Sequence, residues 1–318
     1  MILAVVVPSF KVRNHILAVV TDALQFVDRV YVVDDCCPER SGQLVEESFS
    51  DPRVTVLRHA ENQGVGGAVV TGYRQAMADG CDIVIKMDGD GQMEAAQIPT
   101  LIRPIVDGTA DYAKGNRFFA IDYLKGMPTI RLLGNSTLSF VNKLASGYWN
   151  VMDPTNGFTA IHTEALRWLP LERLARRYFF ESDMLFRLAT IRAVVRDVPI
   201  PARYGDEVSS LKVGRVLLDF PLRYAAVFVK RFVYCYILRD LNVGTIESFA
   251  GMALLLFGLI FGAANWAKAL ATGMLTPSGT VMLASIAVIL GVQFLLAAVS
   301  FDVNNVPDEP LHRRISSS

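Results

Sequence analysis

Short apolar runs alternate with longer amphipathic stretches over the first 118 residues of the chain. The short runs are rich in β-branched residues, a pattern typical of strands buried on both faces of a parallel sheet. They predict strands at residues 2–7, 29–34, 53–58, 82–88 and 111–115. The stretches between them predict helices at residues 15–26, 43–49, 67–78 and 95–106. This alternation predicts an α/β domain, Rossmann-like, whose mostly parallel sheet is covered by helices on both faces.

The second half of the chain becomes progressively more apolar. Residues 126–149 predict an unusually apolar helix, residues 179–192 a further helix, and residues 194–201 another strand. Residues 248–267 and 269–301 contain no charged side chain, and each stretch is long enough to cross a bilayer once as a helix. The two stretches therefore predict a transmembrane hairpin, with its turn at the glycines and proline of residues 273–279.

The segment before this hairpin predicts an amphipathic helix. Between residues 212 and 230 charged residues recur at three- and four-residue spacing with apolar residues on the complementary face, so the helix should lie in the headgroup plane. Pro221 is expected to kink or divide it. We expect four regions: a catalytic domain at 1–212, an amphipathic juxtamembrane helix at 213–240, a transmembrane hairpin at 241–303 and a loose polar cytoplasmic tail at 304–318.

Basic residues gather at the outer ends of the hairpin rather than at its turn. The positive-inside rule then places both ends of the chain in the cytoplasm of an inner-membrane protein. Gly258 and Gly262 form a small-xxx-small pair that lets helices approach closely, which fits a homo-oligomer. The basic residues are Lys230, Arg231, Arg239, Arg313 and Arg314 at the outer ends, and Lys268 near the turn.

Composition narrows the class of protein further. Hydrophobic residues make up 52% of the chain, which is high for a soluble enzyme, and Lys plus Arg equal Asp plus Glu at 31 each, so no nucleic-acid partner is predicted. The four cysteines show no CxxC spacing and are expected to be reduced thiols. The first ten residues are too short for a signal peptide and are interpreted as the first strand, which keeps the N-terminal domain in the cytoplasm.

An acidic turn with two glycines follows the predicted strand at 82–88. Asp88 and Asp90 lie two positions apart at the carboxyl end of a parallel strand, where ligands of such sheets bind. Carboxylates in this arrangement can converge on one hard cation, Mg²⁺ or Mn²⁺, which in turn bridges diphosphate oxygens. Gly89 and Gly91 let the backbone turn and approach the phosphates.

Four motifs in a fixed order make the chain resemble a known family. They are VVVPSF at residues 5–10, VVDD at 32–35, NQGVGGAVVTG at 62–72 and DGDGQ at 88–92. Together they resemble family 2 glycosyltransferases of the GT-A fold, and within that family the polyprenyl-phosphate glycosyltransferases, over residues 2–212. A dinucleotide fingerprint does not fit, because Val69 stands where glycine or alanine is expected.

The resemblance implies a donor site for a nucleotide-diphosphate sugar, linked to UDP or GDP. Pro8, Ser9 and Asp35 would line the nucleotide base and ribose, with Asp34 supporting them. The donor pocket would be shaped by Asn62, Gly64 and Gly67. The metal and the diphosphate would be held by Asp88, Asp90 and Gln92, and Gly89 would also contact the donor. The chain departs from the family at Cys36 and Cys37, where a small pair such as Gly-Ser is usual.

The resemblance also implies an acceptor site for a lipid phosphate. Guanidinium groups bind phosphate bidentately, and several converging on one point would bind such a lipid at the membrane surface. Three carboxylates of the motifs DPTNGF and YFFESDMLFR lie near the sugar or open a helix in this family. The basic residues are Arg117, Arg131, Arg203 and Lys212, and the carboxylates are Asp153, Glu181 and Asp183.

Three hypotheses follow for the function. The first is a metal-dependent, inverting single displacement that makes a polyprenyl-phosphate sugar on undecaprenyl or dolichyl phosphate, where no base is needed. The second keeps the fold but transfers the sugar to a hydroxyl of a lipid-linked oligosaccharide or glycolipid in surface polysaccharide synthesis, where Asp153, Glu181 or Asp183 must act as base. The third is a non-catalytic membrane scaffold.

Overall fold

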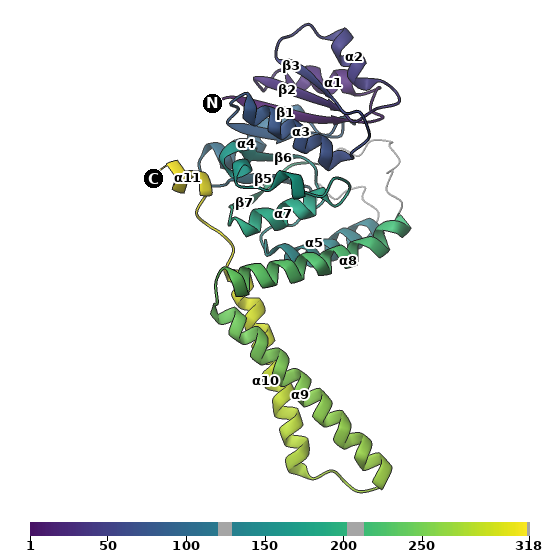
Figure 1. Cartoon of the computed structure of the whole chain (residues 1–318), viewed down its shortest axis with the longest axis vertical. Coiled ribbons are helices and arrows are strands. Elements are labelled where there is room, and N and C mark those ends of the chain that lie inside the picture. Colours follow the sequence, from purple (N-terminus) through teal and green to yellow (C-terminus); the bar gives the residue numbers. More distant parts are fainter. Residues whose placement is uncertain (120–128, 202–212, 317–318) are drawn as a thin grey trace. The chain divides into compact units, whose positions relative to one another are not determined.

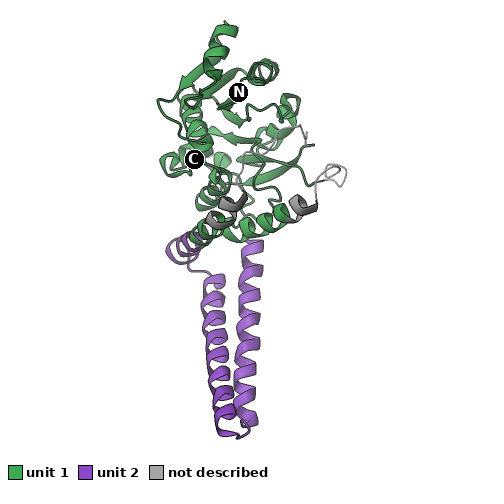
Figure 2. Ribbon diagram, turned by 90° about the vertical axis from the view of Figure 1, so that its right-hand side faces the viewer, with its two compact units in different colours: residues 1–228, 307–318 green, residues 229–306 purple. Residues whose placement is uncertain are grey.

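The computed structural model describes residues 1–119, 129–201 and 213–316, and of residues 129–133, 213–219 and 314–316 only the backbone. The chain forms two compact units, shown in different colours in Figure 2. Unit 1 comprises residues 1–228 and 307–318, and unit 2 comprises residues 229–306. The chain therefore leaves unit 1 once, forms unit 2, and returns to unit 1 for its last segment.

Unit 1 is built on a seven-stranded sheet with the strand order β3-β2-β1-β4-β6-β5-β7 (Figure 1). Strand β1 pairs in parallel with β2 and β4, and β2 pairs in parallel with β3. Strand β6 runs antiparallel to β4 and β5, while β7 is parallel to β5. The strands are β1 (Leu3–Ser9), β2 (Arg29–Asp34), β3 (Val54–Arg58), β4 (Ile83–Lys86), β5 (Tyr112–Asn116), β6 (Thr159–His162) and β7 (Val195–Pro199).

The α/β fold with a mostly parallel sheet is confirmed, and all six predicted strands are present. The sequence analysis missed β6, the antiparallel strand between β4 and β5. Only four residues, Thr159–His162, form it, which is too short for an alternating or continuous apolar pattern to stand out. Because β6 is antiparallel to both neighbours, β4 and β5 still run in the same direction and end at the same edge of the sheet.

Helices cover both faces of the sheet. Val5 and Val7 of β1 belong to the main core cluster with residues of α1 and α4, whereas Val6 points to the opposite face and contacts Gly72 of α3. The helices of the sheet domain are α1 (Ile16–Ala23), α2 (Ser41–Ser48), α3 (Val65–Ala78), α4 (Ile98–Val106), α5 (Thr129–Ser146), α6 (Thr163–Arg167) and α7 (Phe180–Thr190), with short 3-10 turns at Ala95–Gln97 and Leu171–Arg173.

The predicted amphipathic segment forms α8 (Val213–Phe232), and its residues up to Phe228 belong to unit 1. Pro221 lies inside this helix and does not divide it, and a kink at this position stays a prediction. Tyr224 packs in a second core cluster with Phe179 and shares a hydrogen bond of 2.6 Å with the hydroxyl of Ser182 on α7. Helix α8 is therefore joined to the helix that carries two of the candidate carboxylates.

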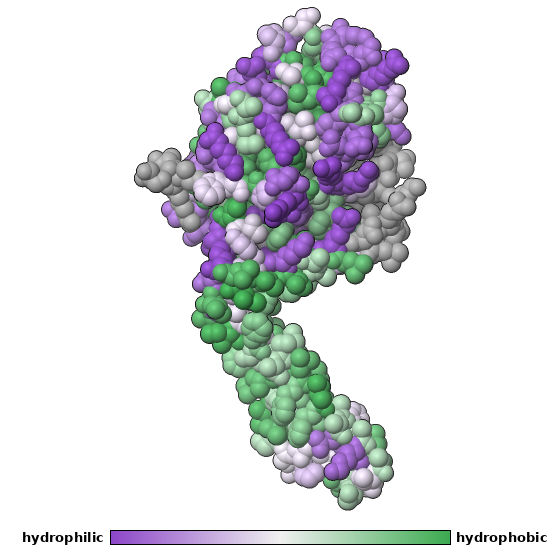
Figure 3. Space-filling view, viewed as in Figure 1, coloured by the Kyte–Doolittle hydropathy of each residue, from purple (hydrophilic) through white to green (hydrophobic). Residues whose placement is uncertain are grey.

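Unit 2 contains the two long helices α9 (Val243–Thr272) and α10 (Ser278–Asn304), preceded by a π-helix at Val233–Leu238. Both are long and apolar enough to cross a membrane, and most of their apolar side chains are exposed. Figure 3 shows that apolar residues dominate the visible surface of this hairpin. A soluble protein would bury such helices, so the predicted two-helix membrane hairpin agrees with the structure.

Close packing between α9 and α10 occurs at glycines spaced by seven residues. A Cβ on Gly251 would lie 3.0 Å from the carbonyl oxygen of Gly291, and one on Gly258 would lie 2.9 Å from that of Ala284. Gly262 leaves more space, since its Cβ would meet only the Cβ of Ala284 at 3.5 Å. The small residues of α9 thus serve packing within the hairpin, and contact between copies of the chain stays a prediction.

The C-terminal tail is not loose, contrary to our expectation. Its last helix, α11 (Leu311–Ser316), belongs to unit 1 and is held by the buried carboxylate of Asp111. That carboxylate accepts hydrogen bonds from the backbone N–H groups of Leu311 (2.8 Å), His312 (3.0 Å) and Val194 (2.8 Å), and contacts Nδ1 of His312 at 2.7 Å. The ring of His312 stacks on His162 at 4.4 Å. A composition-based reading could not foresee this, because the anchoring carboxylate lies 200 residues earlier in the chain.

We predict that Asp111→Asn lowers the melting temperature of the purified protein in detergent by about 5–10 °C. The amide offers one acceptor oxygen where the carboxylate offers two, so buried N–H donors lose their partner at a cost of about 2–3 kcal/mol. Asp107→Asn is the matched control, because Asp107 is exposed and, within the described residues, forms an ion pair only with the exposed Arg103. Equal melting temperatures for the two variants would contradict the proposed anchoring of α11.

Candidate active site

The candidate site lies where β1, β2, β4 and β5 end. These strands run in the same direction, so the residues that follow them share one edge of the sheet. Ser9 ends β1, Asp34 ends β2, Asp88 follows β4 and Arg117 follows β5. The structure thus brings these four predicted residues to the edge at which such sheets bind ligands.

The first two carboxylates of this edge fix the surrounding backbone. Asp34 accepts hydrogen bonds from the N–H groups of Cys37 (2.7 Å) and Gly42 (2.9 Å), and so orders the turn that leads into α2. The hydroxyls of Ser9 and Ser41 lie 2.7 Å apart in the core. Both serines and Asp34 are buried, so they shape the floor of the site.

Asp35 is almost fully buried and orders the NQG segment that opens α3. Its two carboxylate oxygens accept from the N–H groups of Gln63 and Gly64, each at 2.8 Å, and one oxygen contacts Nδ1 of His59 at 2.7 Å. The side-chain amide of Asn62 donates to the backbone oxygen of Asp35 at 3.2 Å. The sequence analysis missed His59, which carries no motif signal. A direct contact of Asp35 with a ribose stays a prediction.

The glycines of this segment accommodate another part of the protein. A Cβ on Gly66 would lie 2.2 Å from the carbonyl oxygen of Ala175, and one on Gly64, whose φ is +85°, would lie 2.5 Å from that of Arg176. The N–H groups of Gly66 and Gly67 donate to the Arg176 carbonyl at 2.9 and 3.3 Å. The segment before α7 therefore packs directly on the start of α3, and glycine is required for that approach.

A buried lysine lies beneath the acidic turn after β4. The ammonium group of Lys86 donates to Asp88 Oδ1 at 2.8 Å and to Glu181 Oε1 at 3.2 Å, while its side chain is only 1% exposed. Burial alone would lower the pKa of Lys86, but the charges of Asp88 and Glu181 outweigh it and raise the pKa above its ordinary value. The sequence analysis missed Lys86; the available signal was a lone charge inside an apolar strand.

The acidic turn itself offers oxygen atoms to a ligand. The side chain of Asp88 is 32% exposed, and a Cβ on Gly157 would lie 2.6 Å from its Oδ2, so the glycine leaves room at that oxygen. Asp90 accepts from the N–H of Gln92 at 3.0 Å. Within the described residues no group of three His, Cys, Asp or Glu side chains is gathered for a metal. Two carboxylates fit Mg²⁺ or Mn²⁺ whose remaining ligands are water or substrate oxygens.

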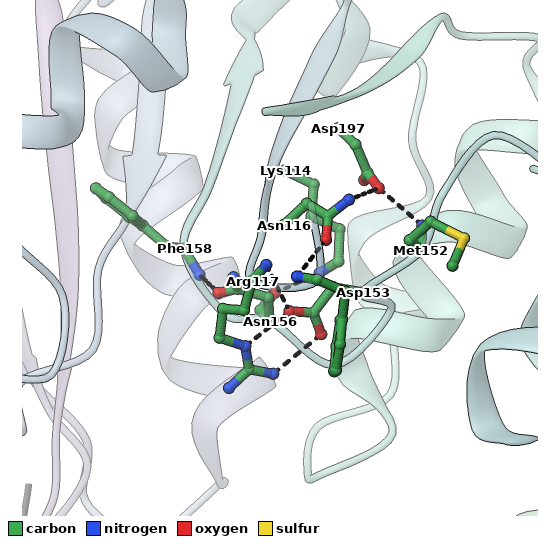
Figure 4. A network of polar contacts seen from close by, with 9 residues as sticks. Lys114, Asn116, Arg117, Met152, Asp153, Asn156, Phe158 and Asp197 are labelled. Carbon is green, nitrogen blue, oxygen red and sulfur yellow. Dashed lines mark hydrogen bonds and ion pairs between the residues drawn. The ribbon is translucent and has the colours of Figure 1, made fainter. Parts of the chain in front are cut away.

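An ion pair lies at the end of β5 (Figure 4). The guanidinium of Arg117 binds the buried carboxylate of Asp153 through two bonds, Nε to Oδ2 at 2.7 Å and Nη2 to Oδ1 at 2.9 Å. The backbone N–H of Arg117 also donates to Oδ2 at 3.3 Å. This bidentate geometry fixes the guanidinium plane at the edge of the sheet, next to the turn that carries Asn156 and Gly157.

Two titratable groups are buried behind this pair. Burial lowers the pKa of Lys114 to about 8, and its ammonium donates to the backbone oxygen of Asn156. Burial raises the pKa of Asp197 to about 6. One oxygen of Asp197 accepts from the side-chain amide of Asn116 (2.9 Å) and from the N–H of Met152 (2.7 Å). None of these contacts follows from a sequence motif.

Of the remaining residues predicted for the site, some are described by the structure and others are not. Asp183 accepts from the N–H of Ala175 at 2.9 Å and pairs with Arg187 at 3.2 Å, so it holds the segment before α7. Pro8 belongs to β1, and its carbonyl oxygen lies near Gly89. The backbone of Arg131 lies in α5 but its side chain is not described, and Arg203 and Lys212 lie outside the described residues.

We predict that Asp197→Asn stabilises the protein at neutral pH. The folded state binds the Asp197 proton more tightly than the unfolded chain does, so wild-type stability falls as the pH rises from about 4 to 6. The amide oxygen can accept both existing hydrogen bonds but cannot ionise. The free energy of unfolding of the variant is expected to exceed that of wild type by about 1–3 kcal/mol at pH 7.5, and this difference should shrink as the pH is lowered towards 4. Thermal unfolding across that range measures it, and a gain independent of pH would contradict the assignment.

Comparisons with known proteins agree with this geometry. Residues 4–169 match the family described as Glycosyl transferase family 2. A UDP-N-acetylglucosamine–dolichyl-phosphate N-acetylglucosaminyltransferase of Methanococcus voltae is 28% identical over 239 residues, covering 71% of this chain and 94% of the relative. An undecaprenyl-phosphate mannosyltransferase of Micrococcus luteus is 32% identical over 173 residues, covering 54% of this chain and 70% of the relative.

A solved structure shares the fold. Glucosyl-3-phosphoglycerate synthase of Mycobacterium tuberculosis, crystallised with UDP, superposes with a TM-score of 0.50 at 20% identity and covers 72% of this chain and 79% of its own. This likeness agrees with the predicted GT-A fold. The family match spans more than half of the chain and includes the ends of β1, β2, β4 and β5. The chain therefore belongs to glycosyl transferase family 2, and the predicted glycosyltransferase is confirmed.

Proposed function

We propose that the chain transfers a sugar from a UDP- or GDP-linked donor to a polyprenyl phosphate, such as undecaprenyl or dolichyl phosphate, at a membrane surface. The observation that carries the proposal is that the acidic turn at Asp88 and the fixed guanidinium of Arg117 lie at the same edge of the sheet. The relatives named for dolichyl phosphate and undecaprenyl phosphate support the same acceptor class.

The donor would bind over the ends of β1, β2 and β4. The ordered segment around Asp35 and Asn62 supports the nucleotide side, and the acidic turn with Asp88 and Asp90 lies at the diphosphate side. Asp88, Asp90 and Gln92 would hold Mg²⁺ or Mn²⁺, which neutralises negative charge on the diphosphate when bound. The buried ammonium of Lys86 keeps Asp88 in place beneath it.

The acceptor would lie beside Arg117. Its guanidinium is oriented by Asp153 before any ligand arrives, which lowers the cost of ordering a phosphate there. A phosphate is ionised near neutral pH and needs no base. The carboxylates of Asp153 and Asp183 are both engaged with arginines, which favours a phosphate acceptor over a hydroxyl that requires a base.

The reaction would be a single displacement with inversion. A phosphate oxygen of the lipid forms a bond to the anomeric carbon as the bond from that carbon to the diphosphate breaks, and the nucleoside diphosphate leaves with the electron pair. The protein contributes by holding the two reactants in line and by placing positive charge near both phosphates. We assign this positioning to Arg117 on the acceptor side, and expect Arg131, Arg203 and Lys212 to contribute to it.

The hairpin α9–α10 would anchor this reaction to the bilayer. The chain leaves the catalytic unit before α9 and returns to it after α10, so two crossings bring both ends to the same side. The excess of Lys and Arg at those ends supports a cytoplasmic location for that side. We also expect a homo-oligomer in the membrane.

We predict that purified protein moves radiolabelled sugar from a UDP- or GDP-sugar into lipid-extractable product, and that Arg117→Ala lowers kcat/KM for the lipid phosphate about 100-fold. Loss of a charge-assisted contact made to the reacting phosphate gives an effect of this size. Binding of the nucleoside diphosphate should persist. Arg167→Ala is the control, because Arg167 forms an exposed pair with Glu164.

Two outcomes would contradict this assignment. Absence of labelled lipid with every common donor would count against a polyprenyl-phosphate acceptor. Loss of turnover in Asp183→Asn with intact donor binding, together with a mild effect of Arg117→Ala, would instead favour a hydroxyl acceptor.

We predict opposite labelling of the hairpin turn and the catalytic unit in intact cells of a bacterial expression host. Leu275 in the turn is 97% exposed, and Cys36 is the exposed native cysteine of the catalytic unit. In a Cys36→Ser background, Leu275→Cys should react with a membrane-impermeant maleimide in intact cells. Cys36 in the wild-type chain should react only after lysis. Labelling of Cys36 in intact cells would reverse the proposed orientation.

A further inference from the structure

We propose that Lys86 is a positioning residue that sets both the orientation and the cation affinity of the acidic turn. It acts through Asp88 and Glu181 and does not itself touch substrate. This inference rests on the proposed function, because it assigns Asp88 to a divalent cation held with the donor diphosphate.

The geometry joins three parts of the fold at one ammonium group. Lys86 ends β4, Asp88 follows in the acidic turn, and Glu181 stands in the first turn of α7. The exposed fractions of the three side chains are 1%, 32% and 13%, in that order. A buried charge is costly unless it is paired, so the ammonium must stay within reach of both carboxylates. Glu181 holds Lys86 at 3.2 Å, and Lys86 in turn holds Asp88 at 2.8 Å.

The ammonium also selects the oxygen of Asp88 that a ligand can reach. It occupies Oδ1 at 2.8 Å, while Oδ2 lies beside Gly157. A Cβ at position 157 would overlap both Oδ2 (2.6 Å) and the ammonium nitrogen (2.4 Å), so this space exists only because residue 157 is glycine. With Oδ1 bound by the ammonium, Oδ2 is the oxygen that Asp88 can offer to a ligand.

The ammonium of Lys86 also sets the net charge of the residues around a bound cation. One ammonium and two carboxylates leave a single net negative charge in the cluster of Lys86, Asp88 and Glu181. Removing the lysine charge would leave two negative charges, and removing the Glu181 charge would leave none. If the cluster only holds the backbone in place, either change should weaken cation binding. If the charge of the cluster sets the cation affinity, loss of the lysine charge should strengthen binding and loss of the Glu181 charge should weaken it.

The test is direct Mn²⁺ binding to the full-length protein in detergent micelles at pH 7.5, read by electron paramagnetic resonance of free Mn²⁺, with and without UDP or GDP. We expect Lys86→Met to lower the Kd about tenfold and Glu181→Gln to raise it about tenfold. The double variant Lys86→Met/Glu181→Gln restores the single net negative charge, and its Kd should lie within about threefold of wild type.

Arg187→Met is the matched control, because it breaks a partly buried ion pair on the same helix, between Arg187 and Asp183, without changing the charge of the cluster. Its Kd should stay within about twofold of wild type. Glu181→Gln alone does not separate the two roles, because weaker binding is expected of it under both. Where Lys86→Met fails to fold, Lys86→Gln replaces it, because it removes the same charge but keeps a polar group that can donate to the carboxylates.

Two negative results have different meanings. Weaker binding in both single variants, or no change in either, would overturn the role of Lys86 while leaving the cation site intact. No Mn²⁺ binding by the wild-type protein, with or without UDP or GDP, would overturn the cation site itself and this inference with it.

Discussion

Charges buried at the carboxyl edge of the sheet persist there only where an opposite charge or hydrogen bonds compensate them, and the site is organised by that constraint. Lys86 pairs with Asp88 and Glu181, and Arg117 pairs with Asp153. The pairs Lys86–Glu181 and Arg117–Asp153 join the end of a strand to a residue much later in the chain, so they also hold the sheet to the segments around it. The cost of burying an unpaired charge in this environment is several kcal/mol, which makes the arrangement rigid before any ligand binds.

The second organising constraint is close approach of backbone to backbone. The segment at Ala175–Arg177 lies directly on the start of α3, and the glycines there fit because a side chain would overlap its carbonyl oxygens. Asp183 then holds the same segment from α7 through the N–H of Ala175. The glycine motif, α7 and the acidic turn are therefore one connected structure, with α7 contributing Asp183 at one point and Glu181 at another.

The sequence was sufficient for the presence and parallel direction of the strands in the first half, because buried parallel strands are long and apolar enough to show in the pattern. It was also sufficient for the residues that end β1, β2, β4 and β5, because the direction of each strand decides the edge at which it ends. It was not sufficient for β6, whose four residues form no period, or for α11, whose anchor Asp111 is distant in the chain. Nor did it indicate the partners of Lys86, since pairing across 95 residues depends on tertiary packing.

Helix α8 and the acidic turn are linked by a short series of direct contacts within unit 1. Tyr224 of α8 shares a hydrogen bond with Ser182 of α7. The residue after Ser182 is Asp183, which binds the N–H of Ala175 and the side chain of Arg187. The residue before Ser182 is Glu181, which holds Lys86. Packing of Tyr224 against Phe179 fixes the start of α7 from the same side. The position of α7 on α8 therefore determines where Glu181 can hold the lysine, and through it the orientation of Asp88. An enzyme that takes its acceptor from a membrane surface gains from this arrangement, because the helix expected to rest on that surface also supports the carboxylate at the donor side.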